Sequence, residues 1–495
     1  MPRDLISQPL CRADQLGACI PDDPHAVSAC LPLWGHNIGY EEGDLFVVDK
    51  LQAAYPRFHF HPIVQKLCDE FLNEHGHRGL PFASERCADR AVEYVRNGGC
   101  EDIKRVPFDG QSAYGVVVPA EEFPLLKQYW QHAGENVSSR VAEQILACIP
   151  ATATETEART TARQRVADVA GAAASDVFLF PSGMAAIACA WRTVSAIRQG
   201  RTCQFGFPYV DTLKIQQRFA SGTCEFLPAG SDADIERLEQ WCHTQPPAAV
   251  FCEVPTNPLL ETPDLPRLRK IADQHDILLV VDDTLAACGN LNVLRYADLL
   301  ATSLTKYFSG YGNVLAGSLV VNPQARNANE LGSAIGDDFE ETLGDSDVAV
   351  LAANSKDHVE RTATINDNAL LLVEHLLQHP AVESVFHPSV ARRNYDQLKS
   401  PNGGYGGLLS IVLRDAESST PKVFDALEVC KGPNLGTNFT LCCPYTLLAH
   451  YDELDFAESC GVSRWLLRIS VGVEPINDLL ARFDRALLHG TCHAD

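Results

Sequence analysis

The segment ATSLTKYFSGYGNVLAG, residues 301–317, sets a single lysine between hydroxyl side chains and glycines. Lys306 is preceded by Ser303 and Thr305, whose hydroxyl groups are suited to hold an anion. Three glycines follow and give the lysine a flexible approach: Gly310, Gly312 and Gly317. A neutral lysine amine condenses with an aldehyde, and partial burial lowers the pKa of an ammonium group toward the range where this happens. The segment is therefore a candidate Schiff-base site.

The residues around this segment predict its position in a sheet. Two apolar-rich runs, 296–301 and 314–321, flank the lysine and are typical of strands. Lys306 would then follow the end of a strand, which is where ligands bind in open α/β sheets. Taken alone, Ser-Leu-Thr-Lys is more often an ordinary surface segment, so the interpretation depends on the rest of the chain.

Composition excludes several classes of protein. The chain has 495 residues, of which 46% are hydrophobic and 21% are charged, as in folded proteins of about two or three domains. Its formal net charge is -24. Nucleic acids and anionic membranes bind clustered lysine and arginine, so neither is an expected partner. Any anion that the protein binds must be held by local groups.

The cysteines indicate a reducing compartment. None of the 18 cysteines forms a Cys-x-x-Cys pair, so no zinc site and no other metal site is predicted. The start, MPRDLISQPLCRADQ, lacks the apolar region of a secretory signal, and no run approaches the length of a membrane span. We therefore expect reduced thiols in a cytoplasmic protein.

The first third of the chain has a weak pattern. Residues up to about 28 show no clear period and are predicted to form a loose arm, while residues 31–119 mix short strand-like and helix-like pieces. Two His-x-His pairs occur there, at 59–61 and 75–77. On a strand, each pair would put both rings on one face and would suit a metal. The neighbouring cysteine and acidic residues form no ligand spacing, so aromatic packing and a polar turn are the preferred interpretation.

A helix, a strand and a second helix follow. Apolar spacing predicts a helix within residues 121–147, and residues 152–171 are an alanine-rich helical segment. The strand-like DVFLF at 176–180 then runs into Pro-Ser-Gly-Met and a helix that reaches about residue 197. A strand, a turn of small residues and a helix N-terminus form an anion site, because free backbone N–H groups and the helix dipole point into it. Many such turns bind nothing.

Strands and helices then alternate. We predict strands at 205–210, 248–254 and 277–281, and a helix at 265–274. The strands are continuously apolar, which favours a mostly parallel sheet covered on both faces, in a doubly wound α/β domain. From about residue 366 a helix and strands at 382–386 and 408–413 begin a smaller α+β unit. The glycine-rich run 403–407 precedes a strand, so it is not interpreted as a phosphate loop.

Two further side chains stand near predicted strand ends. Asp282 directly follows a buried strand, where a carboxylate needs a partner to stay charged. A pyridinium nitrogen is one suitable partner, and helix capping or a structural ion pair is the alternative. Tyr209 either stacks on a bound ring or completes a strand in the core.

In combination these segments resemble the Cys/Met-metabolism family of pyridoxal-phosphate enzymes of fold-type I, in the cystathionine γ-synthase branch of fungal type. The resemblance covers most of the chain. Its motifs, in order, are HAVSACLPLW, GYEEG, PSGMAAI, PYVDTLKI, VPTNPLL, VVDDT, TSLTKYFSGYGNVLAGSLV, LGTNFTLCCPYTLLAH and LLRISVGVE. It implies an N-terminal extension with an intersubunit arm over 1–150, a cofactor-binding α/β domain over 151–365 and a C-terminal α+β domain over 366–495.

The resemblance implies specific roles for the cofactor site. Lys306 would hold pyridoxal 5'-phosphate (PLP) through a Schiff base, and Asp282 would face its pyridine nitrogen. Tyr209 would stack on the ring and exchange protons. The phosphate would be bound by the side chains of Ser303 and Thr305, by the backbone of Gly183 and Met184, and by Arg140 from a neighbouring subunit.

The substrate side departs from the family pattern. Arg468 in LLRISVG would grip the α-carboxylate of the substrate through a bidentate fork. Asn434 stands where the family has a serine, and Val210 and Asp211 replace glycines after the stacking tyrosine. Asn434 and Asp211 are therefore expected near the substrate. A Ser-Ser-Arg sequence replaces the Tyr-x-Arg of the family at 138–140.

The resemblance implies an enzyme that acts on small amino-acid substrates. The leading hypothesis is γ-replacement on an O-acylhomoserine, which joins its aminobutyrate unit to cysteine, as in methionine biosynthesis by trans-sulfuration. Another thiol or a carbon nucleophile is a related possibility. A carbon–sulfur lyase and a non-catalytic binding paralogue are the alternatives. A homodimer or homotetramer is expected.

Overall fold

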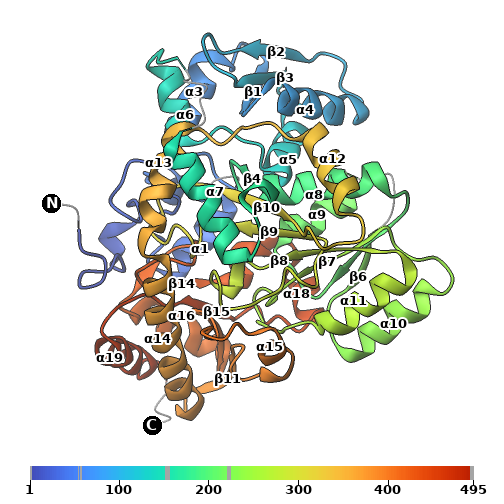
Figure 1. Ribbon diagram of the computed structural model, residues 1–495. Coiled ribbons are helices and arrows are strands. Elements are labelled where there is room, and N and C mark those ends of the chain that lie inside the picture. The colour runs from blue at the N-terminus through green and yellow to red at the C-terminus, as the bar shows by residue number, and fades with distance from the viewer. Residues whose placement is uncertain (1–2, 54, 56–57, 151–155, 220–223, 491–495) are drawn as a thin grey trace.

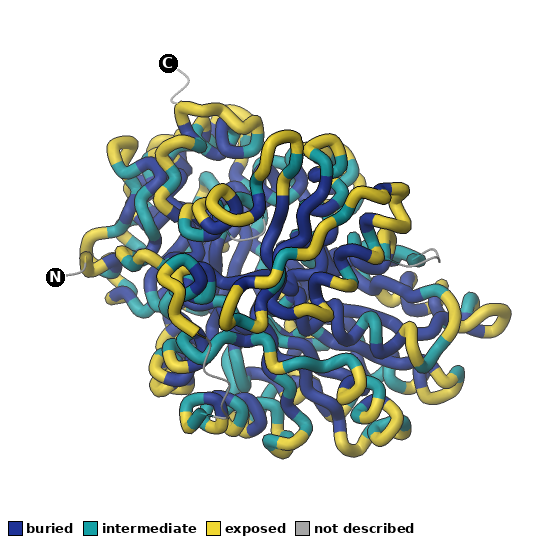
Figure 2. Tube along the Cα trace, turned by 90° about the horizontal axis from the view of Figure 1, so that it is seen from above, coloured by how far each residue is buried: buried dark blue, intermediate teal, exposed yellow. Residues whose placement is uncertain are grey.

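The computed structural model describes residues 3–53, 55, 58–150, 156–219 and 224–490. It contains three sheets, each with its own helices (Figure 1). Buried segments gather in the strands between the helices, and exposed residues lie on outer helices and turns (Figure 2). We propose the division into 1–150, 151–365 and 366–495, which is supported by the presence of one sheet in each part.

The first sheet lies in the N-terminal part, at the top of Figure 1, and is antiparallel with the order β1-β3-β2. Helices α3, α4 and α5 pack on it around a core of its own. The elements are α1 (Trp34–Glu42), α2 (Leu45–Val48), α3 (Pro62–Phe71), β1 (His77–Phe82), α4 (Glu85–Asn97), β2 (Lys104–Pro107), β3 (Tyr114–Pro119), α5 (Phe123–Ala133) and α6 (Ser139–Leu146).

The central sheet has seven strands in the order β4-β10-β9-β8-β7-β5-β6. Strand β10 is antiparallel to both neighbours, and the remaining pairs are parallel. Its elements are α7 (Glu157–Ala170), β4 (Val177–Phe180), α8 (Gly183–Ile197), β5 (Thr202–Phe205), α9 (Val210–Arg218), β6 (Glu225–Leu227), α10 (Asp232–Cys242), β7 (Ala249–Glu253), α11 (Leu265–His275), β8 (Leu278–Asp282), β9 (Leu299–Ser303), β10 (Gly317–Val321), α12 (Ala328–Asp338) and α13 (Asp345–Asn354).

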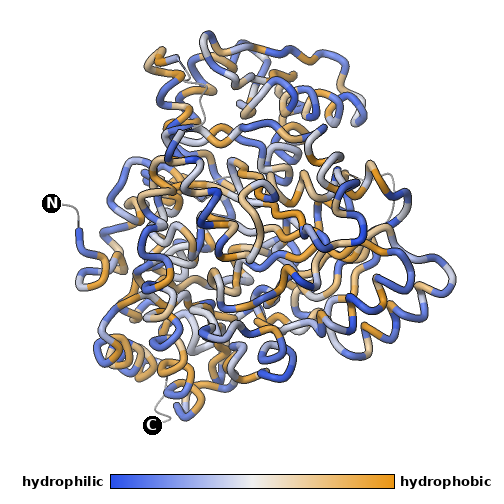
Figure 3. The backbone as a smooth tube through the Cα atoms, viewed as in Figure 1, coloured by the Kyte–Doolittle hydropathy of each residue, from blue (hydrophilic) through white to orange (hydrophobic). Residues whose placement is uncertain are grey.

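Both faces of this sheet are covered, as the continuous apolar strands predict. In β8, Leu279 and Val281 face a cluster with α7, α10, α11 and α13, whereas Leu278 and Val280 face a cluster with α8, α9 and α12. Successive side chains of a strand point to opposite faces, so an apolar run serves two cores at once. Apolar residues follow these interior strands in Figure 3. The predicted doubly wound α/β fold is confirmed.

The third sheet has the order β11-β12-β15-β14-β13 and packs against α14, α16 and α19. Its elements are α14 (His358–Gln378), β11 (Val382–Phe386), α15 (Arg392–Leu398), β12 (Leu408–Leu413), α16 (Ala416–Ala426), β13 (Cys430–Lys431), β14 (Leu441–Pro444), α17 (Tyr445–Ala449), α18 (Leu454–Ser459), β15 (Leu467–Ser470) and α19 (Ile476–Leu487). Helix α14 begins before the predicted start near residue 366. In its first turns Arg361 donates to the carbonyls of Tyr307 and Phe308, beside the lysine segment.

The prediction of a loose N-terminal arm is wrong. Leu10, Ile20 and Cys30 are buried in a cluster with Cys430 and Phe439 of the C-terminal part. The Val27 N–H also donates to the carbonyl of Gly312 at 2.9 Å, so the arm borders the lysine segment. Its apolar residues dock singly along an extended path, and such a path has no helical or strand period in the sequence.

A predicted strand and a predicted helix have different bounds in the structure. The predicted strand 205–210 is wrong beyond Phe205, because Gly206 adopts a left-handed φ of 79° that ends β5, and α9 starts after Tyr209. The predicted helix 152–171 corresponds to α7, and its positions 152–155 lie outside the described residues.

Every cysteine of the described residues is a free thiol, and those residues contain no group of His, Cys, Asp or Glu arranged to hold a metal. Within the same residues, none of the helices combines the length and apolar character needed to cross a bilayer.

Candidate active site

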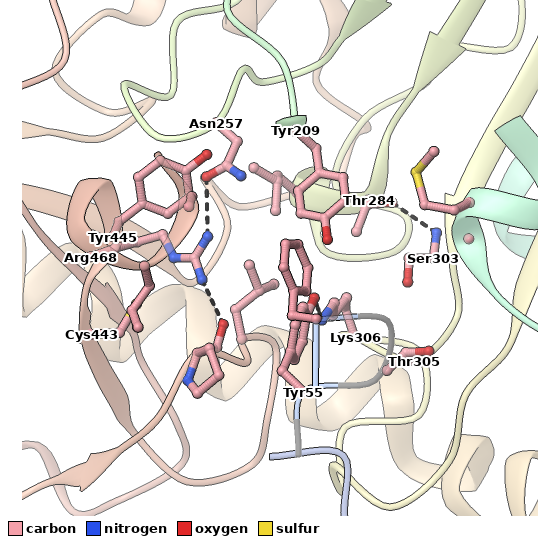
Figure 4. A pocket seen from close by; sticks show the side chains of 18 of the residues that line it. Tyr55, Tyr209, Asn257, Thr284, Ser303, Thr305, Lys306, Cys443, Tyr445 and Arg468 are labelled. Carbon is pink, nitrogen blue, oxygen red and sulfur yellow. Dashed lines mark hydrogen bonds between the residues drawn. The ribbon is translucent and has the colours of Figure 1, made fainter. Parts of the chain in front are cut away.

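A pocket of about 130 Å³ lies at the carboxyl ends of β7, β8 and β9, where an open α/β sheet binds its ligands (Figure 4). All three parts of the chain contribute to its walls. The lining includes Tyr40, Glu41 and Tyr55 from the N-terminal part, Gly183, Met184, Tyr209, Glu253, Asn257, Asp282, Ser303, Thr305 and Lys306 from the central part, and Cys443, Tyr445 and Arg468 from the C-terminal part.

Lys306 lies shortly after β9, which ends at Ser303, and only 8% of its surface is exposed. Its Nζ donates to Asn434 Oδ1 at 2.6 Å and to the hydroxyl of Tyr55 at 2.8 Å. The Nζ atom also lies 4.7 Å from the centre of the Tyr55 ring. The amine is therefore fixed inside the pocket by neutral groups, and Figure 4 shows it in the middle of the lining side chains.

One end of the pocket has the features of a phosphate cradle. Gly183 and Met184 begin α8, and the Ser182 hydroxyl caps the helix by accepting from the Ala185 N–H at 3.1 Å. A Cβ atom at Gly183 would lie only 2.7 Å from the Cβ of Ser303, so only glycine fits there. The first N–H groups of a helix lack internal partners and attract an anion. The Thr305 hydroxyl lines this end, although it pairs with the backbone of Ala316.

Asp282 is the last residue of β8, and its Oδ1 accepts from the Thr284 N–H at 2.9 Å. Desolvation by the surrounding protein raises the pKa of this carboxyl group, and the hydrogen bonds from Thr284 lower it by less. A carboxylate in such a setting gains from a cationic partner. Its position in the pocket lining makes it available to a protonated ring nitrogen.

Tyr209 also reaches the pocket, but from the N-terminus of α9 and not from a strand end. The Tyr209 N–H donates to Glu253 Oε1 at 2.6 Å, which fixes the backbone that carries the ring. Glu253 lies opposite Asp282 in the register of β7 and β8. Burial, and then repulsion by Asp282, raise the pKa of Glu253 well above its ordinary value.

Arg468 lies on β15 and is 6% exposed. Its guanidinium donates to Asn257 Oδ1 at 3.3 Å and to the Pro433 carbonyl at 3.0 Å, and it lies 4.7 Å from the centre of the Tyr445 ring (Figure 4). No carboxylate of the described residues forms an ion pair with it. A buried guanidinium that has only neutral partners is suited to a carboxylate ligand.

Asn434 and Asp211, the two residues expected near the substrate, lie in different places. Asn434 lies beside Lys306, and its Nδ2 is buried without a partner among the described residues. The expectation that Asp211 lies near the substrate is wrong, because its side chain faces α5 and contacts His132 Nδ1 at 2.8 Å. Asp211 is the second residue of α9, so the turn of the helix points its side chain away from the pocket.

Arg140 lies outside this pocket, in a small neighbouring cavity that shares Ser182 with it. Its guanidinium donates to the Asn313 carbonyl at 2.7 Å and to Asp347 Oδ1 at 3.2 Å, so it contacts the end of the lysine segment of its own chain. Contact of Arg140 with the phosphate of a neighbouring subunit stays a prediction.

Several lining residues are absent from the sequence-based site. Asn257 follows β7 in the VPTNPLL segment, so the strand-end argument applied to Asp282 could have found it. Tyr445 and Cys443 come from the LCCPYT motif, which carried no chemical signal of its own. Tyr55 and Glu41 belong to the N-terminal part, whose route over the pocket no local pattern indicates.

The site fits one cofactor well. The helix N-terminus with Ser303 suits a phosphate, the enclosed Lys306 suits an aldehyde, and Asp282 suits a ring nitrogen. Together with the doubly wound, mostly parallel sheet, these groups define a PLP-dependent enzyme of fold-type I.

Comparison with known proteins extends this assignment. The description "Cys/Met metabolism PLP-dependent enzyme" matches residues 152–488, and "Fungal trans-sulfuration enzyme, N-terminal domain" matches residues 63–138. The chain belongs to the Cys/Met-metabolism family of PLP-dependent enzymes, in its fungal trans-sulfuration form. It is an enzyme of the cystathionine γ-synthase and lyase type, and PLP is its cofactor.

Similar proteins match nearly the whole chain. A cystathionine gamma-synthase of Neurospora crassa is 34% identical over 96% of this chain and 98% of its own. A cystathionine gamma-synthase-like enzyme of Amanita muscaria, iboG2, is 32% identical over 94% of this chain and 95% of its own. The crystal structure of metB from Corynebacterium glutamicum has a TM-score of 0.59 and 25% identity, and covers 68% of this chain and 88% of its own.

Proposed function

We propose that the protein catalyses γ-replacement on an O-acylhomoserine, in which cysteine or a related nucleophile takes the place of the acyl group. The observation that supports this most is the buried guanidinium of Arg468 in the same pocket as Lys306, with no carboxylate partner among the described residues. Such a pair suits an amino acid, whose α-carboxylate meets Arg468 while its α-carbon lies near Lys306. The similarity to the Neurospora crassa synthase supports cysteine as the nucleophile.

The residues of the pocket bind and orient the substrate. Arg468 holds the α-carboxylate, and Asn257 and the Pro433 carbonyl fix the guanidinium from behind. The Nδ2 of Asn434, which has no partner among the described residues, donates a further hydrogen bond to the substrate beside Lys306. Aromatic rings, Tyr445 among them, exclude water around the reacting carbons.

Bound PLP supplies an electron sink for the α-carbon. Asp282 would face the ring nitrogen, because desolvation raises the pKa of this carboxyl group and a neighbouring cation would stabilise its ionised form. Lys306 Nζ moves protons at the α- and β-carbons, and the hydroxyl of Tyr55 accepts a hydrogen bond from this amine and orients it. Tyr209 would stack on the ring, and Glu253 fixes its backbone by accepting from the Tyr209 N–H.

The proposed reaction is tested by product analysis. Purified holoenzyme is incubated with O-acetyl-, O-succinyl- and O-phosphohomoserine, each with and without cysteine, and the products are identified by mass. We expect cystathionine from at least one of the esters when cysteine is present. Formation of only 2-oxobutyrate and ammonia, with or without cysteine, would instead assign the protein as a lyase.

Replacement of Arg468 by lysine should weaken substrate binding selectively. Lysine offers a point charge in place of a planar fork, so about 1.5 to 3 kcal/mol of a charged hydrogen bond is lost. This corresponds to an increase in KM for the ester of about 10- to 150-fold. Steady-state kinetics measure the change, and the absorption spectrum of the bound cofactor should stay as in the wild type. An unchanged KM would count against this role.

We also propose that the functional unit is at least a homodimer, because Arg140 of the family arm is expected to complete the site of a neighbouring subunit. Arg140→Ala and Lys306→Ala chains, each inactive, are unfolded and refolded together. Hybrid dimers then contain one site with both native residues, and part of the activity should return. If native mass spectrometry detects hybrids but activity stays absent, Arg140 acts within its own chain, where it pairs with Asp347.

We propose a cytoplasmic location and a role in the trans-sulfuration step of methionine biosynthesis. The free thiols of the described residues support the location, since secreted proteins of comparable cysteine content form disulfides. Complementation of a methionine auxotroph that lacks cystathionine γ-synthase tests the role.

A further inference from the structure

Glu41 is a carboxyl group in the pocket that neither the cofactor nor the α-carboxylate of the substrate explains. It lies near the end of α1, is half-buried and lines the same pocket as Lys306. No donor of the described residues lies within hydrogen-bonding or ion-pairing distance of its carboxylate. The other two lining carboxyl groups differ, because Glu253 accepts from the Tyr209 N–H and Asp282 from the Thr284 N–H.

Glu41 belongs to a helix that packs against the C-terminal elements of the pocket wall. Helix α1 packs against α17, and Tyr40 shares a core cluster with Cys443, Tyr445 and Leu448. Tyr445 in turn contacts the guanidinium of Arg468. The cradle residues lie elsewhere: Gly183 begins α8, and Ser303 ends β9 of the central sheet. Glu41 therefore stands on the substrate side, where the distal end of an amino-acid side chain and its reaction partner would meet.

The second half of γ-replacement needs a base near the γ-carbon of the substrate, where the nucleophile forms its bond. The acyl group leaves the γ-carbon as a carboxylate and takes the electron pair of the carbon–oxygen bond. The nucleophile then forms its bond to the same carbon with its own electron pair, and its proton has to be accepted by a nearby group. Lys306 serves the α- and β-carbons, while Glu253 and Asp282 are held by backbone donors.

We propose that Glu41 is the general base that accepts the proton of the incoming nucleophile. The inference rests on the proposed γ-replacement. The proton passes from the thiol, or another acidic group, to the Glu41 carboxylate and then to solvent, and no further reactant is required. Glu41 thereby favours coupling of the aminobutyrate unit to the nucleophile over its release as 2-oxobutyrate.

The acidity of Glu41 suits this task. Burial, and then repulsion by Asp452, raise its pKa to about 8, and Tyr40 and Tyr451 are the other titratable groups that face it. An ordinary thiol has a pKa of about 8.5, and proton transfer is most efficient when acid and base have similar pKa values. A carboxyl group with its usual pKa of about 4.3 would be a much weaker base.

The test compares coupling with elimination in Glu41→Gln holoenzyme. With ester alone, the release of 2-oxobutyrate should stay within about 3-fold of wild type. With cysteine or 2-mercaptoethanol added, coupling should fall about 100-fold, the lower range for loss of a general base. The more acidic 2,2,2-trifluoroethanethiol arrives as thiolate and should recover most of the loss. Glu41→Asp should retain part of the coupling. Glu42→Gln, which alters an exposed neighbour bonded to Tyr451, is the matched control and should couple normally.

Three results would overturn the proposal. Coupling at the wild-type rate by Glu41→Gln would remove any role in proton transfer. A loss seen with cysteine but not with 2-mercaptoethanol would make Glu41 a binding group for the ammonium of cysteine. An equal loss with both 2-mercaptoethanol and trifluoroethanethiol would indicate a structural role. Failure of the wild-type enzyme to eliminate or couple any ester would overturn the proposed function itself. This result is distinguished from a failure of the Glu41 proposal because it is seen in the wild type, without any variant.

Discussion

Replacement of Lys306 by alanine is expected to lower turnover by at least about 10⁴-fold, below detection in an ordinary assay. The reason is that the same amine holds the aldehyde of the cofactor and then moves the protons of the substrate, so one substitution removes both functions. Lys306 is the one lysine that the described residues place in the pocket lining, so no second amine is positioned there to act in its place. Product formation from an O-acylhomoserine, followed by mass, measures the loss.

The covalent attachment is tested separately. Borohydride treatment of the yellow wild-type holoenzyme should fix the cofactor to the peptide that contains Lys306, and peptide mapping should find no such label in Lys306→Ala. Lys356→Ala, at an exposed lysine, is the control and should be labelled at Lys306 as in the wild type. Label on another lysine, or a Lys306→Ala enzyme that turns over normally, would contradict the assignment.

Replacement of Asp282 by alanine should have the second largest effect. A carboxylate beside the ring nitrogen would keep that nitrogen protonated and so support the electron sink that PLP supplies, which alanine cannot do. We expect kcat/KM to fall about 10³-fold, which corresponds to about 4 kcal/mol of transition-state stabilisation. Weaker PLP retention on dialysis should accompany the loss, because the folded protein keeps a cavity shaped for the ring but loses its charged partner.

Asp282→Glu and Asp273→Asn complete this experiment. Glutamate keeps the charge at a shifted position and should recover part of the rate. Asp273 is exposed on α11 and pairs with Arg269, so its replacement should leave both kcat/KM and PLP retention unchanged. A rate for Asp282→Ala close to that of wild type would show that this aspartate only caps the turn through the Thr284 N–H.

The central sheet was largely predictable because its strands serve two cores. Runs such as Leu278 to Val281 are apolar at every position, and only a strand covered on both faces requires this. The strand-end rule then points to Asp282 and Lys306. The predicted boundary of the 205–210 strand failed for a local reason, since one left-handed glycine at 206 converts the remaining residues into the approach to a helix.

The N-terminal contribution to the pocket could not be predicted from local patterns. Tyr55 contacts Lys306, and Glu41 lines the same pocket, only because about 250 residues of intervening chain fold back on them, and no periodicity encodes that arrangement. The prediction that Asp211 lies near the substrate was wrong for a local reason. Asp211 is two residues past Tyr209 in sequence, but the helical turn of about 100° per residue directs its side chain toward His132 and away from the pocket.

The fate of the γ-carbon tests the proposed reaction most directly. O-Acetyl-, O-succinyl- and O-phosphohomoserine, each labelled with ¹³C at the γ-carbon, are incubated separately with the holoenzyme and cysteine, and ¹³C NMR follows the label. The proposed γ-replacement predicts that the resonance moves from an oxygen-bound to a sulfur-bound CH₂ within an intact amino acid, and that Lys306→Ala leaves it unmoved. Appearance of the label only in the methyl group of 2-oxobutyrate, or no movement in the wild type, would contradict γ-replacement.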